Sequence, residues 1–199
     1  MSDPNFNATI LTKAEARRTY LQKRKSISDK DKLVWDDLIL IQFQKMILPP
    51  VSLAFSYIEM PHQKEVKTES IISFLEFKNP DLRVAYPVCN FQTWTMDAVI
   101  ADENTLFVEN RFGTIEPDSD ERANPKEIDL VIVPLLCFDL MGYRVGYGKG
   151  FYDKYLRETN SDTLKIGLSY FAPIEKILDS DEFDIPLDYC ITPGNIYEF

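Results

Sequence analysis

The sequence predicts a layered α/β domain built around a largely parallel sheet. Helical and strand patterns alternate along most of its 199 residues, and this alternation is typical of sheets covered by helices. The run DLVIVP at 129–134 is almost continuously apolar and β-branched, as expected of a strand buried on both faces. The length suits one sizeable core and no linker or repeat divides the chain, so we expect a single domain over residues 1–199.

Local signals place the first helix near the N-terminus. We expect residues 1–9 to form a loose tail. Thr12 with Glu15 three residues later has the spacing of a capping box, in which each side chain accepts a backbone N–H of the other residue. A helix of about 11–26 should follow.

The second helix is expected near 29–48. Ser28 with Asp31 again marks a helix start, and Pro49 cannot continue a helix because it lacks the backbone N–H. Apolar residues at helical spacing predict one stripe that faces the core. Its members are Leu33, Val34, Leu38, Ile41 and Met46.

The rest of the chain alternates between strands and helices. Residues 109–127 are polar and contain proline, so we expect a loop there. Thr68 should cap a helix of about 69–78 with Ile71, Ile72 and Leu75 inward, and a further helix should span roughly 151–158. Strands are expected at 51–57, 83–87, 94–101, 129–134, 165–169 and 189–192.

Composition and charge exclude several classes of protein. A net charge of −10 argues against general nucleic-acid binding, which needs a broad basic surface. No apolar run approaches the length of a membrane span, and residues 1–13 lack the pattern of a secretory signal. Three widely spaced cysteines and one histidine, His62, argue against a disulfide scaffold, a zinc site and a Ser-His-Asp triad. We therefore expect a cytoplasmic enzyme or binding protein without a membrane or nucleic-acid partner.

Glycines are concentrated in one short segment. Four of the seven glycines lie between Gly142 and Gly150, with Arg144 and Lys149 among them. Glycine lets backbone N–H groups surround an anion, so the segment predicts a phosphate-binding loop. The spacing is neither that of a dinucleotide fingerprint nor that of a Walker loop. The alternative is a tight turn between strand and helix, in which glycines supply positive φ.

Other charged and aromatic residues allow two interpretations each. Asp153 opens the helix behind the loop and is either a favourable N-terminal charge or a Mg²⁺ ligand. Lys13, Arg17 and Arg24 share one helix face, which is either solvated or directed at a site. Surface or capping roles are the default for Glu65, Asp184 and Asp188. Tyr147, Phe151 and Tyr152 can pack in the core or stack on a heterocycle, and we expect Trp94 and Phe112 in the core.

The segment from Pro134 to Asp153 resembles the signature of the 5-formyltetrahydrofolate cyclo-ligase family, also called methenyltetrahydrofolate synthetases. It contains apolar-Phe-Asp followed by Gly-x-Arg-apolar-Gly-x-Gly-Lys-Gly-Phe-Tyr-Asp. Weaker matches follow in the right order: Lys13-Ala-Glu-Ala-Arg17, then Glu65-Val66-Lys67-Thr68, then Asp188. Together they cover nearly the whole chain.

The resemblance implies a three-layer α/β/α sandwich with a Rossmann-like sheet. It implies an ATP- and Mg²⁺-dependent closure of 5-formyltetrahydrofolate to 5,10-methenyltetrahydrofolate, with release of ADP and phosphate. We expect the protein to be a monomer. Lys149 and Arg144 would be catalytic, and Asp153 and Asp188 would bind Mg²⁺. Glu65, Tyr152 and either Phe55 or a residue such as Met60 would bind the folate. ATP would contact Lys13, Arg17, Arg144, Gly146, Tyr147, Gly148, Lys149, Gly150, Phe151 and Tyr152.

Two other hypotheses remain open from the residues alone. A protein that sequesters a folate or a nucleotide without turnover would use the same loop. A different enzyme on the same scaffold, such as a sugar-phosphate isomerase, would also need an anion-binding segment.

Overall fold

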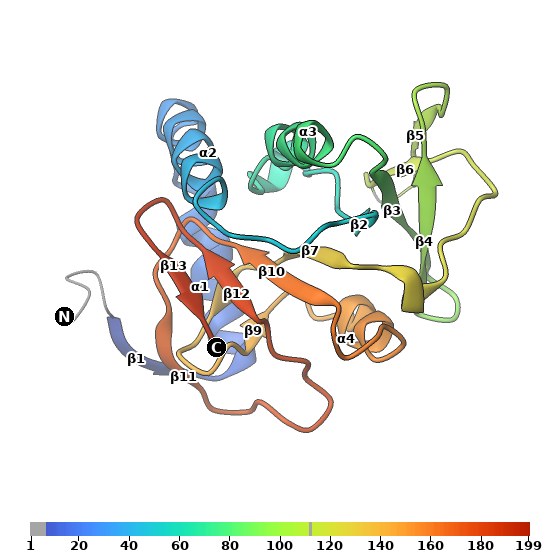
Figure 1. Cartoon of the computed structure of the whole chain (residues 1–199). Helices are drawn as coiled ribbons and strands as arrows, with labels where there is room; N and C mark the ends of the chain where they lie inside the picture. Colours follow the sequence, from blue (N-terminus) through green and yellow to red (C-terminus); the bar gives the residue numbers. More distant parts are fainter. Residues whose placement is uncertain (1–6, 112) are drawn as a thin grey trace.

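A seven-stranded sheet forms the centre of the molecule in the computed structural model, which describes residues 7–111 and 113–199 (Figure 1). The five inner strands run parallel, and both edge strands are antiparallel to their neighbours. This confirms the predicted α/β class with its largely parallel sheet. Across the sheet the strands are β13 (Ile196–Glu198), β12 (Tyr189–Ile191), β10 (Leu164–Leu168), β7 (Leu130–Pro134), β2 (Leu53–Phe55), β3 (Arg83–Asn90) and β4 (Thr95–Ala101).

Strand β7 divides the two main cores. Its side chains alternate across the sheet, because successive residues of a strand point to opposite faces. Leu130 and Ile132 belong to the core cluster on one face, and Val131 and Val133 belong to the cluster on the other face. All four side chains are fully buried, which explains the continuous apolar run in the sequence.

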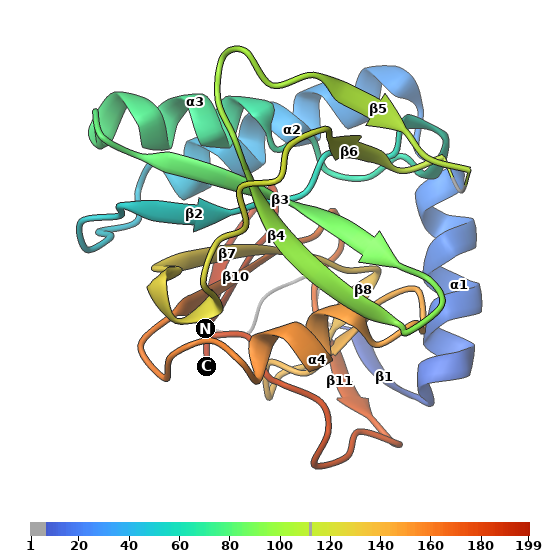
Figure 2. The same ribbon diagram turned by 90° about the vertical axis from the view of Figure 1, so that its right-hand side faces the viewer.

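Helices cover both faces of this sheet. The helices α2 (Asp29–Phe43) and α3 (Glu69–Lys78) pack on one face, and the short α4 (Phe151–Leu156) packs on the other (Figure 1). The helix α1 (Lys13–Lys25) runs along one side of the molecule (Figure 2). There it covers a third, smaller core with the hairpin of β8 (Cys137–Phe138) and β9 (Arg144–Val145).

The predicted helix starts are confirmed by their caps. The Thr12 side chain accepts the backbone N–H of Glu15, and the Glu15 carboxylate accepts the N–H of Thr12, which completes the capping box. Ser28 caps α2 through Asp31. Residues Ile71, Ile72 and Leu75 of α3 are buried as predicted, whereas Thr68 donates to the Tyr57 carbonyl instead of capping the helix.

The predicted apolar stripe of α2 is wrong. Leu33, Val34, Leu38 and Ile41 are exposed, and Leu33 keeps 66% of its surface. The buried face instead carries Ile39 and Phe43, with Trp35 beside them. Both sets have helical spacing, so periodicity alone could not choose the inward one. The helix also ends at Phe43, five residues before the predicted end.

Several connecting segments differ from the sequence prediction. Residues 7–11 form strand β1 (Asn7–Leu11), which pairs in parallel with β11 (Ile174–Ile177), so the predicted tail is wrong over residues 7–9. The predicted loop at 109–127 contains β6 (Ile115–Pro117), which forms a hairpin with β5 (Phe107–Glu109) near β3 and β4 (Figure 2). Short 3-10 helices occur at Pro61–Gln63 and Pro125–Glu127.

The predicted core positions of Trp94 and Phe112 are not confirmed, and the cysteines form no disulfide. Trp94 adopts a left-handed backbone conformation with φ +56° and stays 38% exposed, so its predicted core position is wrong. Phe112 lies outside the described residues. The three cysteines are free thiols: Cys137 and Cys190 are buried, and Cys89 is half-buried.

Candidate functional site

A cavity of about 550 Å³ opens at the carboxyl ends of β7 and β2. Open α/β sheets bind ligands at this edge, and the volume lies in the usual range for ligand sites. Pro134, the last residue of β7, and Tyr57, just beyond β2, line it. The glycine-rich segment Gly146–Gly150 and the start of α4 line one side, and α1 contributes Lys13 and Arg17. The structure therefore brings most of the predicted site residues into one cavity.

The glycine-rich segment depends on glycine at two positions. Gly148 and Gly150 adopt φ of +84° and +70°, values that side chains with a Cβ rarely take. A Cβ on Gly148 would also lie 2.8 Å from Cζ of Arg17. Arg17 donates from Nε to the Gly146 carbonyl at 3.0 Å. The Arg17 guanidinium thus packs directly on the loop, as the predicted grouping of these residues requires.

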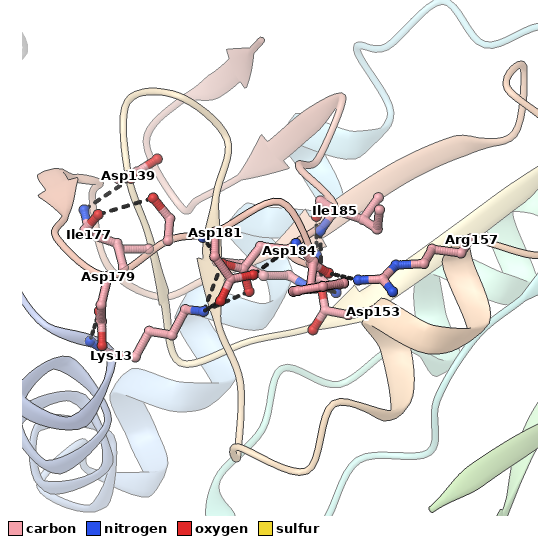
Figure 3. A network of polar contacts seen from close by, with 12 residues as sticks. Lys13, Asp139, Asp153, Arg157, Ile177, Asp179, Asp181, Asp184 and Ile185 are labelled. Carbon is pink, nitrogen blue, oxygen red and sulfur yellow. Dashed lines mark hydrogen bonds and ion pairs between the residues drawn. The ribbon is translucent and has the colours of Figure 1, made fainter.

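Arg144 and Asp153 form an ion pair at the base of this segment. Arg144 Nη2 lies 2.8 Å from Asp153 Oδ1, and Arg144 Nη1 donates to the Ile185 carbonyl. The Ile185 N–H donates to the same Asp153 oxygen at 3.2 Å (Figure 3). Burial lowers the pKa of Arg144, and the Asp153 carboxylate opposes that shift. Arg144 therefore fixes the position of Asp153, which lines the cavity.

Lys13 is held by acidic residues of the C-terminal segment. Its Nζ lies 2.7 Å from Asp184 Oδ2 and 3.6 Å from Asp181 Oδ2 (Figure 3). Its backbone N–H donates to Asp179 Oδ1 at 2.6 Å. Burial acts to lower the pKa of Lys13, but Asp184 and the other carboxylates outweigh it and the pKa is raised. Lys13 and Asp184 both line the cavity, so a cation and a carboxylate lie together there.

Asp188 is not brought to this cavity. Its carboxylate accepts the backbone N–H of Lys165 at 2.7 Å and lies 2.8 Å from Lys165 Nζ. Asp188 immediately precedes β12, and Lys165 is the second residue of the parallel strand β10. Asp188 therefore lies toward the amino ends of these strands, whereas the cavity lies at the carboxyl ends. Asp184, four residues earlier, is the carboxylate of that segment that lines the cavity.

Glu65 lies buried at the inner side of the cavity. Only 3% of its surface is exposed. Its Oε1 accepts the hydroxyl of Tyr147 at 2.6 Å, and its Oε2 accepts the Met60 N–H at 2.8 Å. Burial raises the pKa of Glu65, and these two hydrogen bonds oppose the rise. A carboxylate has about four acceptor positions, so Glu65 can still accept N–H groups of a ligand.

Phe55 does not line the cavity. It is fully buried, and its ring stacks behind Tyr152 with 6.0 Å between centroids. Of the two alternatives for an apolar ligand contact, Met60 is the one that lines the cavity, with Tyr57 and Ile58 beside it. The Tyr152 hydroxyl is buried and has no hydrogen-bond partner among the described residues, although Tyr152 lines the cavity.

Lys149 lies at the rim, where aromatic rings gather. Its Nζ lies 4.8 Å from the centroid of the Trp94 ring, a cation–π contact. Phe151 packs against Trp94 at 5.8 Å and against Phe91 at 5.5 Å. Lys149 and both phenylalanines line the cavity, so a flat group entering here would meet aromatic faces beside a cation.

The carboxylates of the cavity suit one kind of metal ion. Within residues 7–111 and 113–199, no group of three or more histidine, cysteine or acidic side chains could hold a metal alone. Asp153 and Asp184 both line the cavity. Mg²⁺ in nucleotide sites takes one or two carboxylates and completes its shell with phosphate oxygens and water. The donor set therefore fits Mg²⁺ that arrives with phosphates.

No helix in the described part of the chain is long and apolar enough to cross a membrane.

Arg24 does not lie on a solvated helix face, which was one of the two predicted alternatives for Lys13, Arg17 and Arg24. Its side chain is buried and contacts Tyr147.

Comparison with known proteins identifies the family. A statistical description of the 5-formyltetrahydrofolate cyclo-ligase family matches residues 10–193. The chain is 29% identical over 182 residues to the 5-formyltetrahydrofolate cyclo-ligase of Mycoplasma pneumoniae, covering 91% of this chain and 98% of that protein. It is also 29% identical to the enzyme of that name from Escherichia coli K12, over 77% of this chain and 86% of the other.

Solved structures agree. The NMR structure of Aquifex aeolicus 5,10-methenyltetrahydrofolate synthetase superposes with a TM-score of 0.74 at 26% identity, over 94% of this chain and 92% of that one. The family match spans most of the sequence, and the fold agrees with it. The chain therefore belongs to the 5-formyltetrahydrofolate cyclo-ligase family of enzymes.

Proposed function

We propose that this enzyme uses ATP and Mg²⁺ to convert 5-formyltetrahydrofolate to 5,10-methenyltetrahydrofolate, with release of ADP and phosphate. One observation carries the proposal. A glycine-rich loop with Arg17 and Lys149 beside it shares a single cavity with the buried carboxylate of Glu65. The loop with its two cations suits phosphates, and the Glu65 carboxylate suits the N–H groups of a heterocycle, so both substrates would meet in this cavity.

The reaction needs activation of a formyl oxygen. This oxygen is a poor leaving group, so transfer of the γ-phosphoryl group to it would precede ring closure. The N10 nitrogen would then attack the formyl carbon, the C–O bond would break, and phosphate would leave with the proton that N10 loses. Phosphoryl transfer asks a protein mainly for positioning and for neutralisation of charge, and no side-chain nucleophile is required.

The residues of the loop side have distinct proposed roles. Lys13, Arg17 and Lys149 would contact the ATP phosphates, and the backbone of residues 146–152 would surround them. Arg144 would act by holding Asp153, because its guanidinium is already occupied by Asp153 and the Ile185 carbonyl. Mg²⁺ bound by Asp153 and Asp184 would neutralise negative charge on the phosphates during transfer.

The folate side is built from neutral and acidic groups. Glu65 would accept N–H groups of the pterin, since it has acceptor positions beyond those used by Tyr147 and Met60. The unpartnered hydroxyl of Tyr152 would gain a partner when the substrate binds. Met60 would supply the apolar contact.

A coupled assay tests the proposal directly. ADP release should require 5-formyltetrahydrofolate, ATP and Mg²⁺ together, and the methenyl product should appear at the same rate. Lys149→Ala should lower kcat/KM for ATP by about 10–100-fold, the usual effect of losing a hydrogen bond to a charged group. Lys126→Ala, an exposed lysine outside the cavity, should match the wild type. Tight folate binding without any ADP release would overturn the proposed reaction.

A further inference from the structure

A buried chain of three polar groups links α1, the glycine-rich loop and Glu65. Arg24 keeps only 4% of its surface exposed. Its Nη2 donates to the hydroxyl oxygen of Tyr147, and its guanidinium lies over the Tyr147 ring, 5.4 Å from the centroid. The same hydroxyl donates to Glu65 Oε1 at 2.6 Å. Cation, phenol and carboxylate therefore stand in series.

The contacts of Arg24 orient it toward this chain. Its Nη1 donates to the Leu135 carbonyl at 3.2 Å, which fixes the guanidinium next to the segment that follows β7. Its buried Nε has no hydrogen-bond partner among the described residues. Arg24 does not line the cavity, so it does not contact a ligand there, and Tyr147 is the lining residue to which it donates a hydrogen bond.

Glu65 needs a positive group nearby, because an isolated buried carboxylate is costly. Arg24 is a cation that acts on it, and its charge lowers the pKa of Glu65 against the effect of burial. The other groups around it are neutral or acidic: Tyr147 from the loop, Tyr152 from α4, Tyr57 beyond β2, Tyr170 beyond β10, and Glu59 with the N–H of Met60.

We propose that Arg24 is a positioning residue for the folate site: through the Tyr147 hydroxyl it fixes the orientation and negative charge of Glu65. The inference rests on the proposed contact between Glu65 and the pterin. It assigns a second role to Tyr147, which belongs to the nucleotide loop and also orients the Glu65 carboxylate that would bind the folate. A purely structural role for Arg24, through Leu135 alone, is the competing explanation.

The pH dependence of folate use separates these explanations. Arg24→Met removes the charge but keeps much of the apolar stem, so KM for 5-formyltetrahydrofolate should rise about tenfold or more. The acid limb of kcat/KM for folate should move to higher pH, because Glu65 loses the cation that favours its ionised form. Tyr147→Phe should shift the limb in the same direction, and Arg24→Lys should restore part of it.

Non-additivity provides a second readout. If Arg24 acts through Tyr147, the double variant should be no worse for folate KM than Tyr147→Phe alone. Arg18→Met, an exposed arginine on the same helix, is the matched control and should leave folate KM and the pH profile unchanged. Should Arg24→Met fail to fold, Arg24→Lys and Tyr147→Phe measure the same acid limb.

The outcomes divide clearly. Unchanged folate KM in Glu65→Gln would overturn the proposed role of Glu65 itself. A raised KM in Glu65→Gln together with a wild-type acid limb in Arg24→Met and Tyr147→Phe would overturn the positioning role alone. Loss of thermal stability in Arg24→Met with folate KM and acid limb unchanged would assign Arg24 to structure only.

Discussion

Replacing single glycines of the nucleotide loop by alanine tests whether the loop is shaped by backbone conformation or by contact with Arg17. Gly150 has φ +70° with no atom within 4 Å of an added Cβ, so Gly150→Ala introduces strain alone. Gly148 has φ +84°, and its Cβ would lie 2.8 Å from Arg17 Cζ, so Gly148→Ala introduces strain and a clash. Gly194 has neither feature and lies outside the cavity, which makes Gly194→Ala the control.

The magnitudes follow from the conformation. A left-handed backbone costs a residue with a Cβ about 1–2 kcal/mol, and each kcal/mol shifts Tm by about 2–4 °C in a chain of this size. Gly150→Ala and Gly148→Ala should therefore both lower Tm by about 2–8 °C. Only Gly148→Ala displaces the Arg17 guanidinium, so only this variant should raise KM for ATP well beyond the effect of strain.

Two measurements decide the matter: thermal unfolding of the free enzyme, and KM for ATP in the coupled assay. Equal KM for ATP in Gly148→Ala and Gly150→Ala would refute the role of the Arg17 contact. Melting temperatures of both variants within a degree of Gly194→Ala would refute the argument from strain. A raised KM in Gly148→Ala that Arg17→Ala reproduces, without further loss in the double variant, would support both steps.

Three further predictions follow from the polar groups of the cavity. Asp153→Asn removes the ion-pair partner of the buried Arg144 and should lower the free energy of unfolding by about 3 kcal/mol or more, as measured by denaturant unfolding. It should also weaken the Mg²⁺ dependence of turnover, and an unchanged Mg²⁺ titration would contradict the metal role. Tyr152→Phe removes a buried hydroxyl that lacks a partner and should leave Tm unchanged or slightly higher while raising folate KM; a lower Tm would show that the hydroxyl is satisfied in the free enzyme. Because burial raises the pKa of Glu65 in the folded state, its stabilising contribution is complete below its unfolded pKa and is lost as pH rises through the folded pKa. Wild type should therefore lose stability relative to Glu65→Gln as the pH rises above the ordinary pKa of a glutamate side chain, and the opposite trend in urea unfolding would contradict the shift.

Signals carried by neighbouring residues were sufficient for much of the fold. The capping residues Thr12 and Ser28 fix helix starts through contacts only three residues away, and the β-branched run at 130–134 needs no partner to be recognised as a buried strand. The Gly146–Gly150 segment was likewise recognisable, because its glycines and cations are adjacent in the chain. The resemblance to a known family then connected these local signals to a reaction.

Features that depend on packing between distant residues could not be predicted from the sequence. Asp184 and Asp188 are equivalent in sequence, and only the direction of the strands shows which one reaches the cavity. Phe55 follows the expected strand pattern, but the Tyr152 ring covers it. Arg24 belongs to a charged helix face, yet the segment after β7 buries it. In each case the decisive neighbour lies more than 90 residues away or on another element, beyond the reach of periodicity.

The rates at which the free thiols react with an alkylating agent measure local opening of the fold. Burial raises the pKa of Cys89 and of Cys137 to about 12, so near neutral pH only on the order of one thiol in 10⁴ or fewer would be ionised and able to react. Alkylation of the native enzyme is then limited by how often each region opens. Cys89 lines the cavity, whereas Cys137 and Cys190 lie in separate cores. The labelling rates of Cys137 and Cys190, followed by mass spectrometry, would give two local opening free energies without any engineered probe, and the rate of half-buried Cys89 would report access to the cavity.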